Sequence, residues 1–72
     1  MRFVVRWEFS SRRRRKPDRV DSGWLPTLSE AKSYACRAIR QEPRDIWIEN
    51  EAGKLVMNAA AIQTEFERQR GQ

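Results

Sequence analysis

Few side chains in this sequence are of the types that perform chemistry. Its 72 residues include no histidine and a single cysteine, Cys36. These counts exclude a disulfide framework, zinc sites built from cysteine and histidine, and catalysis by a cysteine–histidine pair or an imidazole base. Neither a glycine-rich phosphate-binding loop nor an activated nucleophile is visible. The sequence therefore predicts a protein that is not an enzyme, with no catalytic residue and no cofactor.

Acidic side chains are the remaining candidates for a metal site. Five could in principle bind a magnesium ion: Asp18, Asp21, Asp45, Glu49 and Glu51. The first two lie in a basic segment and the last two flank an expected turn, which is the ordinary placement of solubilising charges. We therefore predict no metal site.

The most distinctive feature is an uninterrupted run of five cations, which we call the cationic run: Arg12, Arg13, Arg14, Arg15 and Lys16. The chain has 15 Lys+Arg and 10 Asp+Glu, a net charge of +5. Adjacent cations raise the local potential, and counterion release favours contact with phosphates at low salt. Arginine also pairs with carboxylates in bidentate fashion, so an acidic protein surface suits the run equally well. We predict that the run, helped by Arg6 or Arg19, binds an anionic partner.

Two other interpretations of the cationic run stay open. It could be a solvated loop whose charges only aid solubility, although a block of like charges repels itself. In a eukaryote the same residues would be typical of a nuclear localisation signal. No recognition helix and no aromatic-rich RNA motif accompanies the run, so nothing predicts sequence-specific recognition.

The pattern of apolar residues predicts one small domain over residues 1–72. Residues 2–9 alternate as a half-buried strand does, and residues 10–26 form a long basic loop with a short edge strand near 19–22. A helix is expected over residues 27–41, because Thr27 and Glu30 fit a capping box and Pro43 ends it. Its buried face is rich in alanine, Cys36 packs at the margin of that face, and Arg37 and Arg40 lie near its C-terminal end, where the helix dipole favours cations.

A hairpin and a second helix complete the expected fold. Residues 45–49 and 54–57 are strand-like, and Gly53 between them can take the positive φ that the turn needs. Residues 59–70 should form a C-terminal helix too short to be stable without docking. The sequence thus predicts an α+β fold: a small antiparallel sheet of three or four strands, one helix packed on a face, and a short C-terminal helix. The expected core members from the strands are Phe3, Val5, Trp7, Phe9, Ile46, Ile48, Leu55 and Met57.

The second face of this sheet would show Trp47 together with Val4, Arg6, Glu8, Glu49 and Val56. The C-terminal helix could cover it with Ile62 and Phe66. Alternatively, the face forms a homodimer or docks a partner, since tryptophan is enriched at interface anchors. Base stacking is disfavoured, because the carboxylates beside Trp47 would repel phosphate. Trp24 and Trp47 are therefore the candidate apolar anchors.

Location follows from what the sequence lacks. The longest apolar stretch, residues 59–62, is too short to span a bilayer, and residues 1–6 lack the apolar core of a secretion signal. A single cysteine also suits a reducing compartment. We expect a cytoplasmic protein with no membrane contact.

The order of these elements resembles that of certain small phage-encoded anti-CRISPR proteins. The likeness covers residues 1–58: a first strand, a polar loop, a helix that opens Leu28-Ser29-Glu30-Ala31-Lys32, and a hairpin. Those inhibitors are βαββ-like, lack catalytic residues, and dock on the protein that holds a guide RNA in type I surveillance complexes. The resemblance implies a phage or mobile-element inhibitor that occludes nucleic acid on a host nucleoprotein complex. The alternative is a stand-alone accessory protein that binds the DNA or RNA backbone without sequence specificity.

Overall fold

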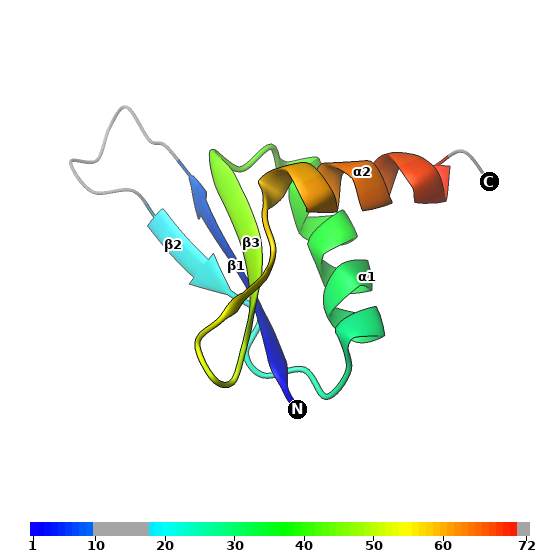
Figure 1. Cartoon of the computed structure of the whole chain (residues 1–72). Coiled ribbons are helices and arrows are strands. Elements are labelled where there is room, and N and C mark those ends of the chain that lie inside the picture. Colours follow the sequence, from blue (N-terminus) through cyan, green and yellow to red (C-terminus); the bar gives the residue numbers. More distant parts are fainter. Residues whose placement is uncertain (10–17, 71–72) are drawn as a thin grey trace.

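The computed structural model describes residues 1–9 and 18–70. Its elements follow in the order β1 (Phe3–Phe9), β2 (Asp18–Asp21), α1 (Leu28–Ala38), a 3₁₀ turn (Ile39–Gln41), β3 (Asp45–Asn50), β4 (Leu55–Met57) and α2 (Ala59–Arg70). The strands form one antiparallel sheet in the order β2-β1-β3-β4, and both helices lie on the same side of it (Figure 1). The predicted α+β fold is confirmed.

β1 is a central strand of the sheet. It pairs with β3 from Phe3↔Asn50 to Glu8↔Asp45. On its other side it pairs with β2, from Arg6↔Asp21 to Phe9↔Asp18, which confirms the expected edge strand. Because successive side chains of a strand point to opposite faces, Val5 and Trp7 are buried on the helix side while Arg6 points away from it.

Helix α1 begins as the sequence predicts. The Thr27 hydroxyl oxygen accepts a hydrogen bond from the Glu30 backbone N–H at 3.2 Å. Three small residues on its inner face, Ala31, Ala35 and Ala38, are buried, so the helix backbone lies close to the sheet. After the 3₁₀ turn the chain reverses at Glu42, whose φ of 54° is left-handed.

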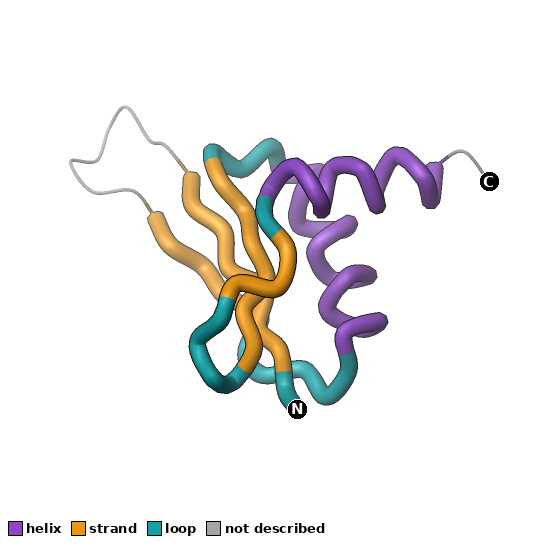
Figure 2. Tube along the Cα trace, in the orientation of Figure 1, coloured by secondary structure: helices purple, strands orange, loops and turns teal. Residues whose placement is uncertain are grey.

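Helix α2 packs against α1 and the sheet on the same side as α1 (Figure 2). Its single buried residue, Ile62, joins one core cluster with Val5, Ile46, Ile48 and the alanines of α1. This placement excludes the alternative in which the C-terminal helix covers the Trp47 face with Ile62 and Phe66. In the described part of the chain, no helix lies on that face.

The pairing of β3 with β4 corrects one expected core residue. Ile48 faces Met57 as a regular hairpin would have it, but Glu49 faces Leu55, so the register shifts by one residue between these two pairs. Such a bulge places two residues of one strand opposite one of the other. Val56 therefore packs against the core, while Leu55 turns to the opposite face and is 61% exposed. The predictions that Leu55 is a core residue and that Val56 lies on the outer face were wrong.

Candidate functional site

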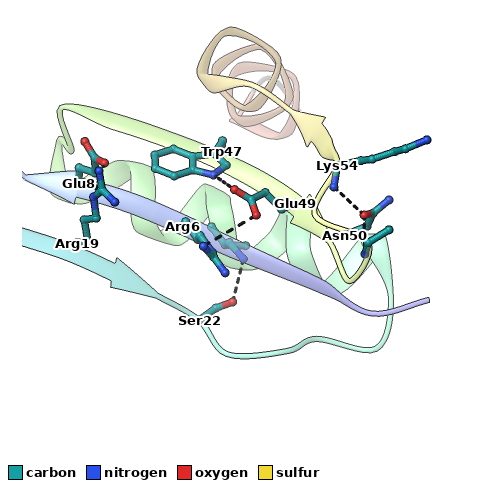
Figure 3. A network of polar contacts seen from close by, with 10 residues as sticks. Arg6, Glu8, Arg19, Ser22, Trp47, Glu49, Asn50 and Lys54 are labelled. Carbon is teal, nitrogen blue, oxygen red and sulfur yellow. Dashed lines mark hydrogen bonds and ion pairs between the residues drawn. The ribbon is translucent and has the colours of Figure 1, made fainter.

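The sheet face opposite the helices, which we call the open face, carries the candidate anchor Trp47. β1 contributes Arg6 and Glu8 to it, and β3 contributes Trp47 and Glu49 (Figure 3). The register of β2 puts Arg19 beside Glu8. Because the strands run antiparallel with matching register, side chains distant in sequence meet in one layer here.

Glu49 is the centre of the polar contacts on the open face. It accepts a hydrogen bond from the Trp47 indole N–H at 2.6 Å, and its other carboxylate oxygen lies 4.0 Å from the Arg6 guanidinium. Beside this group, Arg19 forms an ion pair with Glu8 at 2.9 Å. The two arginines that we expected to help the cationic run therefore each have a carboxylate of the same face as a partner. The hydrogen bond from the indole N–H to Glu49 fixes the orientation of the Trp47 ring.

The apolar surface of the open face continues from Trp47 to Leu55. A shallow hollow of about 340 Å³ lies between them, with lining residues Asp45, Trp47, Glu49, Gly53, Leu55, Asn58 and Ala59. Its described lining combines apolar side chains with the carboxylates of Asp45 and Glu49 and includes no cation. Half-buried Trp47 and exposed Leu55 supply its large apolar side chains.

Trp24, the other candidate anchor, lies between β2 and α1. It is 49% exposed, and the Arg2 guanidinium lies over its ring, 5.5 Å from the centroid. The adjoining Leu25 is bridged to Phe3 by two backbone hydrogen bonds, which fix the segment against the start of β1. No contact among the described residues joins Trp24 to Trp47, so the two are separate aromatic positions.

The cationic run lies outside the described residues, but the structure fixes where its flanks are. Phe9 and Asp18 are register partners at the end of the β1–β2 hairpin, so residues 10–17 connect two adjacent strands. The run contains five of the 15 cations of the chain, which leaves ten cations and ten anions in all the other residues. The net charge of the protein is therefore that of the run.

A second hollow, which sequence reasoning missed, lies between the two helices. We call it the inter-helix groove; it has a volume of about 550 Å³ and is lined by Ser33, Cys36, Arg37, Arg40, Phe66, Gln69 and Arg70. The spacing of Arg37 and Arg40 gave a signal for one basic helix face. Only the packing of α2 on α1 adds Arg70 and Phe66 to it.

Cys36 is a buried packing residue, as its position on the helix predicted. Burial, with a further contribution from the charge of Glu65, raises the pKa of its thiol above the ordinary value, against the opposing charge of Arg40. Across residues 1–9 and 18–70, no group of three or more histidine, cysteine or carboxylate side chains is placed to hold a metal ion. None of the described helices is both long and apolar enough to cross a membrane.

No family model, curated protein or solved structure matches this chain.

Proposed function

We propose that this chain is a non-enzymatic binding protein that docks on a nucleoprotein complex. In this proposal the cationic run contacts the nucleic acid, and the open face contacts the protein that holds it. The observation that supports it is the separation of two chemistries: the run carries the whole net charge, whereas the open face combines paired charges with exposed apolar surface around Trp47 and Leu55.

The open face also argues against nucleic acid as the sole partner. Its arginines are paired with Glu8 and Glu49, so it does not extend the cationic surface of the run. Carboxylates beside Trp47 disfavour a base stacked on the indole, because the phosphates of that strand would approach them. A partner with an anionic part and an apolar part satisfies both surfaces. The resemblance to anti-CRISPR proteins would make that partner a host complex that holds a guide RNA.

The alternative, binding to free DNA or RNA, uses the cationic run alone. Its expected signature is steep salt dependence. If all five cations met duplex phosphates, the slope of log K against log salt would be roughly −4.5, and replacement of two would reduce it to roughly −2.7.

The test compares the binding of this chain to free nucleic acid with its binding to a nucleoprotein complex. Fluorescence anisotropy with a labelled 20-nucleotide DNA and RNA, across salt concentrations, gives the affinity of the run for a bare backbone. Retention of ribonucleoprotein from host lysate on the tagged chain, with and without nuclease, gives the affinity for a complex. We expect weak binding to free DNA and RNA, and retention of a complex that both Arg13→Ser/Arg14→Ser and Trp47→Ala reduce.

The matched control is Arg44→Ser/Lys54→Ser, which removes the same charge from exposed positions outside the run and the open face. It should retain the complex as the unchanged chain does. Equal loss in the control would make the effect one of net charge, and tight binding to free nucleic acid that Trp47→Ala leaves unchanged would establish the alternative. A dimer in light scattering that Trp47→Ala dissociates would assign the open face to a second copy of the chain.

A further inference from the structure

The inter-helix groove collects arginines that have no carboxylate partner among the described residues. The described residues include eight arginines, of which four lie within 4.0 Å of a described carboxylate: Arg2, Arg6, Arg19 and Arg68. Three of the other four, Arg37, Arg40 and Arg70, line this one groove. No carboxylate is among the lining residues in the described part of the chain. Of the five described arginines outside the groove, four are paired with a carboxylate and Arg44 is not, so the convergence of three unpaired arginines on one groove stands apart.

Two of these guanidinium groups are held in place by an aromatic ring. Arg40 lies 5.9 Å and Arg70 lies 5.7 Å from the centroid of Phe66. A guanidinium over a ring is held by cation–π attraction, while the N–H groups at its edge stay available as donors. Phe66 thus joins a cation of the 3₁₀ turn that follows α1 to a cation of α2. Ser33 and Gln69 add neutral polar groups to the lining of the groove.

Without a bound anion, the positive charges that line the groove repel one another, which costs free energy. Arg37 and Arg40 are three residues apart on one helical face, where like charges repel. Arg37 and Arg70 do complement the C-terminal ends of their helices, in whose last turns they lie. Interaction with the helix ends does not require the cations of the two helices to line one groove. It also does not explain why Arg40 and Arg70 both lie over the ring of Phe66.

We propose that the inter-helix groove binds a phosphate group of a nucleotide or a polynucleotide. A phosphate presents more oxygens than a carboxylate, and three converging guanidinium groups match it better. The groove is lined by residues of α1, the 3₁₀ turn and α2. Both helices lie on the side of the sheet away from the open face (Figure 1), so this site is independent of the function proposed above.

The experiment uses the full chain with all five residues of the cationic run replaced by serine, so that the run contributes no binding to the measured signals. Two-dimensional NMR follows the arginine Nε–H signals while inorganic phosphate, AMP and a ten-nucleotide single-stranded DNA are added in turn. We expect saturable shifts of Arg37, Arg40 and Arg70 that exceed those of Arg44. Saturation by AMP at or below the DNA concentration assigns the site to nucleotides, and tighter, salt-dependent saturation by DNA assigns it to a polynucleotide backbone.

Two variants in the same background identify the residues. Arg37→Ser/Arg70→Ser should weaken binding at least tenfold, about the smallest effect expected when hydrogen bonds to a charged group are lost. The matched control Arg44→Ser/Lys54→Ser should bind as before. Melting temperatures verify that each variant is folded, and Arg37→Lys/Arg70→Lys keeps the helix-end charges if the serine variant is not.

Absence of saturable shifts, or equal weakening in the control, would overturn the proposal. So would unchanged binding in the serine variant or, where that variant does not fold, in the lysine variant. Because the run is absent throughout, failure here leaves the proposed function standing, and failure of the run to bind a complex leaves the groove standing.

Discussion

Replacement of Ile62 by alanine tests how helix α2 is attached to the fold. Ile62 is 1% exposed and is the single buried residue of this helix. Truncation of a fully buried isoleucine costs about 2–5 kcal/mol, from lost burial and from the cavity left behind. A domain of this size has a free energy of unfolding of roughly 4–11 kcal/mol, so the loss would be a large share of it. A helix of 12 residues has little stability of its own, so α2 depends on this contact.

Urea unfolding, followed by far-ultraviolet circular dichroism and by tryptophan fluorescence, measures the effect. Ile62→Val should cost about 0.5–1.5 kcal/mol. The control Gln63→Ala lies on the exposed side of the same helix and should change stability by less than about 0.5 kcal/mol. If Ile62→Ala were as mild as Gln63→Ala in both signals, α2 would not be docked through Ile62. The groove between the helices would then lose its structural basis.

Three further outcomes are expected. Leu55→Ala should change the free energy of unfolding by less than about 0.5 kcal/mol, because Leu55 is exposed at the bulge. In a regular hairpin Leu55 would lie in the core, and the same substitution would cost about 2–5 kcal/mol. Urea unfolding distinguishes the two outcomes. Glu42→Gly should stabilise the fold by up to about 1 kcal/mol, because glycine adopts the left-handed φ of this position without strain. The control Glu42→Ala removes the charge but keeps the strain, so it should not raise the melting temperature. Burial raises the pKa of the Cys36 thiol above its ordinary 9.0. As the pH rises through that value, the thiol ionises in the unfolded chain before it ionises in the folded one, so the free energy of unfolding should fall. Cys36→Ala should remove this fall, which melting curves at increasing pH would measure.

Much of the fold follows from local sequence patterns. Alternation in residues 2–9 predicts β1, the Thr27–Glu30 capping pair predicts the start of α1, and Gly53 predicts the turn of the second hairpin, where its φ is 80°. In each case the physical cause lies within a few residues. These are the features that a single sequence can reveal.

The features that escaped prediction depend on contacts between distant segments. A stripe of Ala59, Ile62 and Phe66 shows that α2 buries one side, but not which surface covers it. The one-residue bulge opposite Glu49 leaves no mark in the alternation of β4, and it exchanges Leu55 with Val56. The inter-helix groove needs cations from two helices and is invisible until they are packed together.

The central position of β1 has a consequence for how the chain folds. Its partner β3 follows only after β2 and α1, so the apolar segment Phe3–Phe9 must stay unpaired on that side until residues 45–50 are made. Such long-range pairing slows folding, and an exposed β-forming segment is prone to aggregate in the meantime. Charged residues beside such a segment act as gatekeepers against intermolecular pairing. We therefore expect the five cations that follow β1 in the sequence to keep the nascent chain dispersed, whatever they bind afterwards.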